Sequence, residues 1–230
     1  MLTITDLTVE YTDGTRAIEA VSFSIDAGEN VALIGANGAG KTSLLLTLVG
    51  VLEANRGEIK IGETILGKKT LREIRSRVGL VFQNPDDQLF MPNIFEDVAF
   101  GPRGFGCDEA ETSRRVKAAL AGLGIDHLAT RSPLKLSGGE KRLAAIATTL
   151  ATEPEFLLFD EPTAFLDPRA RRNLSVVLSS LPQGKLIATH DLGFAQEVCS
   201  RTLLLEKGRL VADGGLEILL DTSRLEEAGL

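Results

Sequence analysis

The sequence predicts an α/β fold in which a mostly parallel β-sheet forms the core, an antiparallel β layer lies at the N-terminus and an α-helical subdomain is inserted. Three observations predict it. Short apolar runs alternate with longer segments of helical periodicity. The first residues instead alternate apolar and polar side chains. One long internal stretch is helical in pattern without intervening strands. Strands that alternate with helices indicate a parallel core.

The strand segments are of two kinds. LTITDLTVEY, which starts at Leu2, and AVSFSI, residues 20–25, alternate apolar and polar residues, as expected for antiparallel strands with one exposed face. Four later segments are nearly continuous apolar runs, which is typical of strands buried on both faces of a parallel sheet. These runs cover residues 30–35, 79–83, 156–160 and 185–190.

Helical segments lie between the apolar runs. They cover residues 41–49, 139–151, 168–180 and 192–199. The third opens with Pro168, a residue that is favoured in the first turn of a helix because its missing N–H would have no helical partner there. Each segment is long enough to cross back over a sheet between two parallel strands.

Residues 84–136 interrupt this alternation. Within them DEAETSRRVKAALAGLG places Val116, Leu120 and Leu123 on one helical face and charged residues on the other. We therefore expect a mostly helical subdomain inserted between two core strands. The expected boundaries are a single domain over residues 1–230, with a core of about residues 1–83 and 152–230 and a helical subdomain of about residues 84–151.

Composition narrows the functional classes. The net charge of −7 argues against a surface built to neutralise nucleic-acid phosphates, so we expect no nucleic-acid partner. No apolar stretch reaches the roughly 18–20 residues that cross a bilayer, and no signal peptide is visible, which predicts a soluble, non-secreted chain. Cys107 and Cys199 fit a reducing cytoplasm, and with His127 and His190 they form no zinc-type ligand pair.

The most specific motif is the glycine-rich loop GANGAGKT between a predicted strand and a predicted helix. It matches GxxxxGK[ST], the phosphate-binding loop of NTPases. Its backbone N–H groups converge on phosphate oxygens, while Lys41 reaches the β- and γ-phosphates and Thr42 ligates Mg²⁺. A glycine turn that only joins strand and helix is the alternative, and the lysine and threonine in register argue against it. The expected nucleotide ligands here are Gly35, Ala36, Asn37, Gly38, Ala39, Gly40, Lys41, Thr42 and Ser43.

Two acids end the apolar run FLLFDE, residues 156–161. Asp160 and Glu161 would emerge at the carboxyl edge of the sheet, beside the phosphate loop. Asp160 is predicted to hold Mg²⁺ and Glu161 to polarise the attacking water, because successive residues at a strand end point in different directions. Alone the pair would fit a surface turn, but the upstream loop favours the catalytic interpretation. These two motifs suit any phosphate-loop NTPase.

The segment LSGGE, residues 136–140, precedes a predicted helix, where Ser137 and two glycine amides could cap the helix and receive an anion. It resembles the LSGGQ signature of ATP-binding cassettes. Further markers of that family occur in the same order. Tyr11 resembles the aromatic residue that stacks on adenine, and Gln83 resembles the Q-loop glutamine. AFLD at residues 164–167 resembles the D-loop, and His190 resembles the switch histidine. The resemblance covers nearly the whole chain.

The resemblance implies an ATPase, with ATP and Mg²⁺ as cofactors, in which two nucleotide-binding domains with RecA-like cores pack head to tail. Each ATP is then enclosed between one phosphate loop and the partner's signature, and a homodimer is the simpler expectation because one chain carries every motif. The implied roles are catalysis by Glu161, His190 and Gln83, Mg²⁺ ligation by Thr42, Gln83 and Asp160, and nucleotide contacts from Tyr11, residues 35–43, Ser137, Gly138, Gly139, Glu140 and Asp167. A core histidine is the alternative for His190.

Three residues depart from the family pattern. Glu140 replaces the glutamine of the signature, Leu143 stands where many members have arginine, and Phe165 stands where the D-loop usually has a small residue. Glu140 would bring a carboxylate near the phosphates unless it points away. None of the three removes a phosphate or metal ligand, so an active enzyme is expected.

The passage after Gln83 resembles the ATPases of energy-coupling-factor importers, which take up cobalt, nickel, biotin and other vitamins. It includes NPDDQLF and NIFEDVAFGP, and LLDTSRLEEAGL at residues 219–230 is similar to the tail of the same group. The run LSGGEKRLAAIAT looks most like the cobalt or nickel branch. The resemblance implies an importer ATPase at the cytoplasmic face of the cell membrane, bound to integral membrane subunits. Alternatives are the ATPase of a vitamin importer or an exporter, or a soluble cassette protein.

In such an importer the loop after Gln83 is expected to grip a cytoplasmic helix of the membrane subunit. The expected contacts are Asp86, Asp87, Phe90 and Met91. A solvated loop with a buried phenylalanine is the alternative for this segment.

Overall fold

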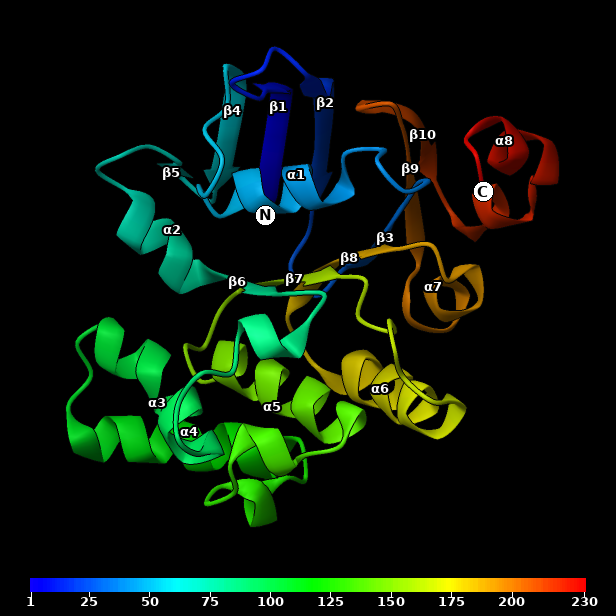
Figure 1. The fold of residues 1–230 in the computed structure, drawn as a ribbon. Helices are drawn as coiled ribbons and strands as arrows, with labels where there is room; N and C mark the ends of the chain where they lie inside the picture. Colours follow the sequence, from blue (N-terminus) through cyan, green and yellow to red (C-terminus); the bar gives the residue numbers. More distant parts are fainter.

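Two β-sheets and eight α-helices make up the computed structural model, which describes residues 1–230 (Figure 1). The smaller sheet has the order β2-β1-β4-β5 and is antiparallel throughout. Its strands are β1 (Leu2–Glu10), β2 (Arg16–Ile25), β4 (Arg56–Ile61) and β5 (Thr64–Ile65). The apolar residues Leu2, Ile4, Leu7 and Val9 of β1 are buried, and the alternation with polar residues is interrupted once, between Ile4 and Leu7, where the strand register shifts.

The larger sheet has the order β10-β9-β3-β8-β7-β6, and all of its neighbouring pairs are parallel except β10 with β9. Its strands are β3 (Asn30–Ile34), β6 (Val78–Val81), β7 (Phe156–Asp160), β8 (Gly184–Thr189), β9 (Arg201–Glu206) and β10 (Arg209–Gly214). Every residue of β7 and β8 is buried, as their continuous apolar runs predict. The predicted fold class, a mostly parallel sheet with an antiparallel N-terminal layer and inserted helices, is confirmed.

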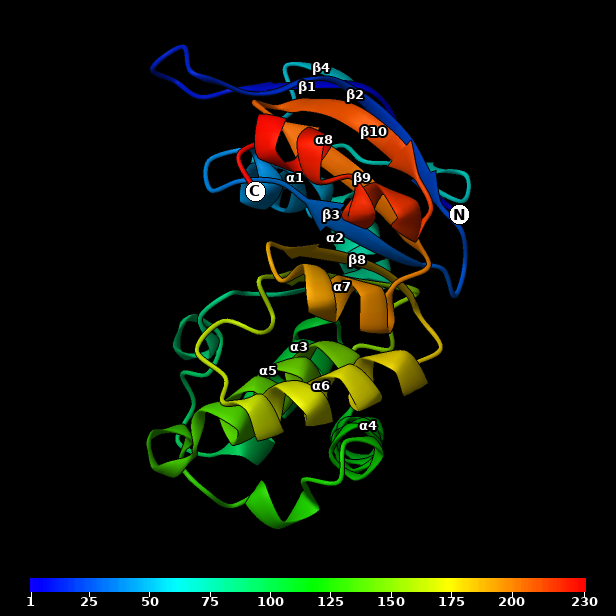
Figure 2. The same cartoon turned by 90° about the vertical axis from the view of Figure 1, so that its right-hand side faces the viewer.

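Most of the helices lie on one face of the larger sheet (Figure 2). Helix α1 (Lys41–Leu48) packs between the two sheets, against β7 and β2. On the opposite face of the larger sheet lie α3 (Ile94–Gly104), α4 (Glu109–Gly122), α5 (Gly138–Leu150), α6 (Pro168–Ser180) and α7 (Leu192–Val198), while α2 (Leu71–Arg77) leads into β6 and α8 (Thr222–Glu227) follows β10. No helix in residues 1–230 is both long enough and apolar enough to span a bilayer.

Two apolar cores result from this layering. A cluster of 25 buried residues fills the space between the sheets, and one of 34 joins the larger sheet to the helices on its other face. Strand β7 contributes to both, because Phe156 and Leu158 face the first cluster while Leu157 and Phe159 face the second. This double burial fixes the position of the strand that carries Asp160 at its end.

Some element boundaries differ from those predicted. Strand β6 ends at Val81, so Gln83 lies in the following loop and does not end the strand. Helix α5 begins one residue earlier than predicted, at Gly138, because Ser137 acts as its N-cap. The helical stretch includes α3 and α4, and the short 3₁₀ turns Pro85–Asp87, Asp126–Leu128 and Pro133–Lys135 connect them to their neighbours.

Candidate functional site

The glycine-rich loop and the acids that end β7 meet in one cleft. The cleft has a volume of about 430 Å³ and lies where the parallel strands β3, β7 and β8 end. Its lining includes the predicted site residues Tyr11, Ala36, Asn37, Gly38, Gly40, Lys41, Thr42, Ser43, Gln83, Asp160, Glu161 and His190. Two predicted residues, Gly35 and Ala39, support the loop without lining the cleft. The structure therefore brings together residues from five separate parts of the sequence.

The loop conformation depends on glycine at two positions. Gly40 caps α1 with a φ of 106°, and a Cβ there would lie 2.5 Å from the carbonyl oxygen of Ala17. A Cβ at Gly35 would lie 2.4 Å from the carbonyl oxygen of Leu205. Larger residues at these positions would displace the backbone, whose N–H groups are the expected phosphate donors.

The side chain of Lys41 is buried within the loop. Its Nζ donates hydrogen bonds to the carbonyl oxygens of Gly35 at 2.6 Å and Ala36 at 3.2 Å, and lies 3.4 Å from Glu161 Oε1. An ammonium group held at this position can bind an anion that enters the cleft.

Thr42 and Asp160 form an oxygen-rich pair suited to Mg²⁺. Thr42 Oγ1 donates a hydrogen bond of 2.7 Å to Asp160 Oδ2, whereas Asp160 Oδ1 is buried without a hydrogen-bond partner. Burial raises the pKa of Asp160 above its usual value. A carboxylate, a hydroxyl and the nearby Gln83 amide fit the hard, oxygen-preferring Mg²⁺, which in nucleotide sites uses one or two carboxylates plus phosphate oxygens.

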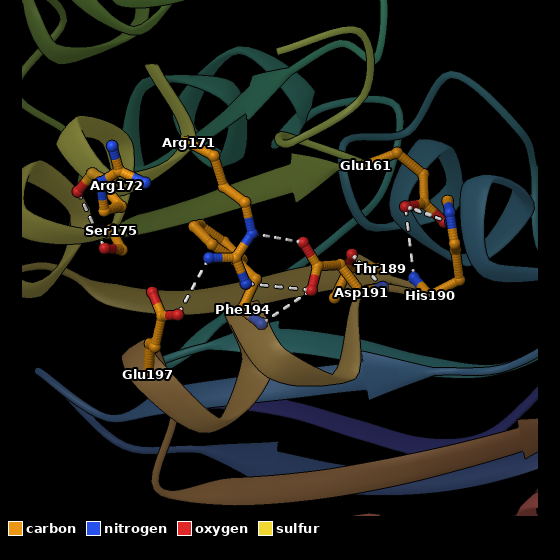
Figure 3. A network of polar contacts seen from close by, with 9 residues as sticks. All are labelled: Glu161, Arg171, Arg172, Ser175, Thr189, His190, Asp191, Phe194 and Glu197. Carbon is orange, nitrogen blue, oxygen red and sulfur yellow. Dashed lines mark hydrogen bonds and ion pairs between the residues drawn. The ribbon is translucent and has the colours of Figure 1, made fainter. Parts of the chain in front are cut away.

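Glu161 lies between Lys41 and His190, and Figure 3 shows its contacts with His190. Its Oε2 is 2.9 Å from His190 Nδ1 and accepts a 3.3 Å hydrogen bond from the His190 backbone N–H, while its Oε1 faces Lys41. The backbone φ of Glu161 is 43°, a left-handed conformation that costs a non-glycine residue about 1–2 kcal/mol. The buried carboxylate is thereby turned toward the exposed imidazole at the end of β8.

A network that the sequence did not predict fixes the segment after His190 (Figure 3). Arg171 donates two hydrogen bonds, of 2.7 and 3.1 Å, to the carboxylate of Asp191 and one of 2.9 Å to Glu197. Its guanidinium also lies 5.5 Å from the ring centre of Phe194. Hydrogen bonding from Arg171 lowers the pKa of Asp191. The bidentate contact anchors the residue next to His190 to helix α6.

Tyr11 joins the cleft from the turn between β1 and β2. Its hydroxyl lies 2.7 Å from Ser43 Oγ, and the side chain is partly exposed. The ring therefore borders the phosphate loop directly, on the side of the cleft where a nucleoside base would be expected.

The signature residues and Asp167 do not share this cleft. Ser137, Gly139, Glu140 and Asp167 line a separate hollow of about 560 Å³ between α5 and α6, and Gly138 lines a third of about 280 Å³ beside Phe165. One copy of the chain therefore presents the phosphate loop and the signature on different surfaces.

Glu140 forms a capping box with Ser137. The Ser137 backbone N–H and Oγ each donate a 2.8 Å hydrogen bond to Glu140 Oε2, and Ser137 Oγ accepts one of 3.3 Å from the Glu140 N–H. The bond from the Ser137 N–H is the main reason that the pKa of Glu140 is lowered. The carboxylate is thus turned toward its own helix start.

Arg142 is a further residue that sequence reasoning missed. It is 1% exposed, and it donates hydrogen bonds of 2.7 Å to the carbonyl oxygen of Phe82 and 2.6 Å to that of Gln83. Burial lowers its pKa to about 10. Arg142 thereby ties the signature helix to the loop that carries Gln83, while the neighbouring Leu143 is buried in the helical core.

The ABC transporter family matches residues 18–164 of this chain. A putative ABC transporter ATP-binding protein of Geobacter sulfurreducens is 50% identical, with 97% of this chain and 92% of the relative covered. An energy-coupling factor transporter ATP-binding protein of Carboxydothermus hydrogenoformans is 45% identical over 99% of this chain and 85% of that protein.

Solved structures show the same similarity. The cbiO1 protein of Clostridium perfringens, described as part of the ABC transporter complex cbiONQ, has a TM-score of 0.86 and 33% identity, covering 98% of this chain and 92% of that one. A dimeric ABC transporter cassette in a post-hydrolysis state, bound to ADP and phosphate, has a TM-score of 0.82 and 25% identity, covering 94% and 99%.

Proposed function

Because this chain belongs to the ABC transporter family and is an ATPase subunit, we propose that it drives a membrane importer of the energy-coupling-factor type. We place it peripherally at the cytoplasmic face of the cell membrane. The main support for this proposal is an aromatic groove beside Gln83. It includes residues of the segment that resembles energy-coupling-factor ATPases. The 45% identity to a protein of that name supports it.

The groove has a volume of about 280 Å³ and is lined by Phe82, Phe90 and Phe100. These side chains are 37%, 62% and 54% exposed, and the rings of Phe90 and Phe100 pack edge to face with centres 5.1 Å apart. Exposed aromatic side chains around a hollow are typical of a protein interface. We assign the groove to a cytoplasmic helix of the membrane subunit.

Asp97 adds a polar feature to the same groove. Its Oδ1 accepts hydrogen bonds of 2.9 Å from the backbone N–H groups of Phe90 and Met91, whereas its buried Oδ2 has no partner. Burial raises the pKa of Asp97. Through the bonds of Oδ1, Asp97 holds the backbone that carries Phe90 at the groove. Among the contacts expected from the sequence, Asp86 pairs with Lys141 at 2.6 Å and Met91 is half-buried, so Phe90 and Asp87 remain the more accessible ones.

For hydrolysis we propose that Lys41 and the loop N–H groups bind the β- and γ-phosphates of ATP. Asp160, Thr42 and Gln83 would hold Mg²⁺, which when bound neutralises charge on these phosphates. Glu161 polarises the attacking water as general base. His190 keeps its Nδ1 toward Glu161, which leaves Nε2 for the γ-phosphate side.

We further propose that the working unit is a homodimer in which Ser137, Gly138 and Gly139 of one copy cover the ATP held by the other. The separation of the two clefts within one chain supports this, because neither surface alone surrounds a triphosphate. The dimeric relative with ADP and phosphate agrees with it. In such a dimer Glu140 remains paired with Ser137 and Asp167 caps α6 through the N–H groups of Arg169 and Ala170.

The cargo is proposed as cobalt or nickel ions, supported by the sequence pattern of the signature helix. The alternatives are a vitamin or an exported compound, since the ATP site is the same in each case.

Affinity purification from mildly solubilised membranes of the native host tests the importer proposal. Mass spectrometry should identify a multi-spanning membrane subunit together with a small cargo-binding membrane protein. A variant with Phe90→Ser and Phe100→Ser should lose these partners and keep basal ATPase activity. Val176→Ser, which changes a side chain 69% exposed on α6, is the matched control and should retain them. Recovery of ribosomal or DNA-bound proteins alone would overturn the transport assignment.

A further inference from the structure

The contact between Tyr11 and Ser43 links the two ends of the nucleotide cleft. Tyr11 belongs to a tight turn closed by backbone hydrogen bonds from Tyr11 N to the Thr15 carbonyl at 2.9 Å and from Gly14 N to the Tyr11 carbonyl at 2.9 Å. Ser43 is in the first turn of α1, directly after Lys41 and Thr42. Their hydroxyl oxygens are 2.7 Å apart, a short hydrogen bond between residues 32 positions apart in the sequence.

Ser43 uses its hydroxyl in a manner unusual for a helix. Serine and threonine hydroxyls inside helices commonly donate to the carbonyl three or four residues earlier, as Thr47 does to Ser43 at 2.7 Å. The Ser43 hydroxyl instead has Tyr11 as its hydrogen-bond partner. Its oxygen is therefore held toward the cleft, although the residue is 92% buried, being 8% exposed.

The direction of the hydrogen bond determines what Ser43 can do. Either hydroxyl can donate on geometry alone. A phenol is more acidic than an aliphatic hydroxyl and therefore the better donor, and a serine hydroxyl has one proton and two acceptor lone pairs. When Tyr11 donates, Ser43 keeps its own proton for a third group, and a donor relay of this kind strengthens both bonds.

We propose that the Tyr11 hydroxyl is a positioning group: it orients the Ser43 hydroxyl so that the serine proton points at a phosphate oxygen of the nucleotide. This rests on the proposed ATP site and adds to it, because stacking on the base needs only the aromatic ring. The hydroxyl instead acts on the phosphate end of the ligand, through Ser43.

Isothermal titration with two probes, tripolyphosphate and ADP, separates the two roles. Tyr11→Phe keeps the ring and should lower the affinity for both probes by the same factor, about three- to tenfold, because one hydrogen bond to a charged group is weakened. Tyr11→Leu removes the ring as well and should weaken tripolyphosphate to the same extent but ADP further. Melting temperatures should be unchanged within a degree or so, since Tyr11 is partly exposed.

A double-mutant cycle tests the route through Ser43. Ser43→Ala should weaken tripolyphosphate at least as much as Tyr11→Phe does, and the double variant should bind no more weakly than Ser43→Ala alone. Wild-type affinity for tripolyphosphate in Tyr11→Phe, or losses that add in the double variant, would overturn the inference. A wild-type chain that binds neither probe would instead overturn the ATP site on which it rests.

The chain has one tyrosine and no tryptophan, so its intrinsic emission reports Tyr11 alone. Saturation of the wild type with tripolyphosphate should change this emission, because the phosphate polarises the Ser43 hydroxyl that Tyr11 contacts. In Ser43→Ala, titrated to saturation, the change should be lost. An equal change in both proteins would contradict the role of Ser43.

Discussion

Replacing Arg142 by methionine tests whether the buried contact between the signature helix and the loop of Gln83 serves activity more than stability. The change keeps the length and apolar bulk of the side chain but removes the hydrogen bonds to the carbonyl oxygens of Phe82 and Gln83. Charge-assisted hydrogen bonds contribute about 1.5–3 kcal/mol each, so two of them contribute about 3–6 kcal/mol.

Burial of the charge opposes this gain. Burial lowers the pKa of Arg142 to about 10, which corresponds to about 3 kcal/mol of destabilisation of the charged form. The guanidinium Nε also lacks a partner. The net loss of unfolding free energy in Arg142→Met is therefore expected between about 0 and 3 kcal/mol, so that the variant remains folded.

Activity should respond more strongly. Without Arg142 the backbone of residues 82 and 83 is no longer held against α5, and a misplacement of about 1 Å at Gln83 can reduce kcat by roughly tenfold to a hundredfold. Urea unfolding followed by circular dichroism measures stability, and steady-state ATP hydrolysis measures kcat. Arg142→Lys keeps the charge but loses the fork of hydrogen-bond donors, so its kcat should lie between those of the wild type and Arg142→Met. Wild-type kcat in Arg142→Met, or a stability loss well above about 3 kcal/mol, would show that this contact does not serve activity more than stability.

Three other changes have defined outcomes. Glu161→Gln should keep ATP binding, lower kcat by about 10²- to 10⁴-fold and accumulate a dimer in size-exclusion chromatography with ATP; sustained turnover would remove Glu161 from the catalytic role. Asp97→Asn should raise the melting temperature at pH 7, because burial penalises the charged form of Asp97. Because the folded-state pKa of Asp97 is raised, ionisation of Asp97 destabilises the folded state increasingly as the pH rises above 3.8, and this destabilisation is absent below it. The gain in melting temperature of Asp97→Asn should therefore vanish in acid. A gain independent of pH would contradict this. The backbone φ of Phe165 is 62°, and its side chain is 90% exposed. Phe165→Gly relieves this backbone strain and should stabilise the monomer by about 1 kcal/mol while it weakens the dimer. A lower melting temperature would show that the ring packs within the monomer.

The nucleotide cleft could be predicted from the sequence because its parts follow strand ends. The loop after β3, Asp160 at the end of β7 and His190 after β8 all lie at the carboxyl edge of one parallel sheet, and β3, β8 and β7 are neighbours in it, so these residues come together. Continuous apolar runs in the sequence predicted β7 and β8. They did not predict β4, whose first three residues are exposed and include the charged Arg56 and Glu58, nor the paired strands β9 and β10.

Contacts between distant elements could not be predicted. Arg142 with residues 82 and 83, and Arg171 with Asp191, depend on which helix faces which loop, and charged residues in helices usually face solvent. The orientation of Glu140 is different, because serine followed three residues later by glutamate is a capping-box pattern and could have indicated that the carboxylate turns toward Ser137.

Complementation between two inactive variants tests the composite ATP site most directly. Lys41→Ala removes the phosphate-loop cation, and Ser137→Arg blocks the signature surface, so neither homodimer has an intact site. If the site is shared between copies, each mixed dimer contains one intact site, and an equimolar mixture should recover up to about a quarter of the wild-type sites. ATPase activity that appears only on mixing is the predicted result, while a mixture no more active than the separate variants would contradict a site built from two copies of this chain.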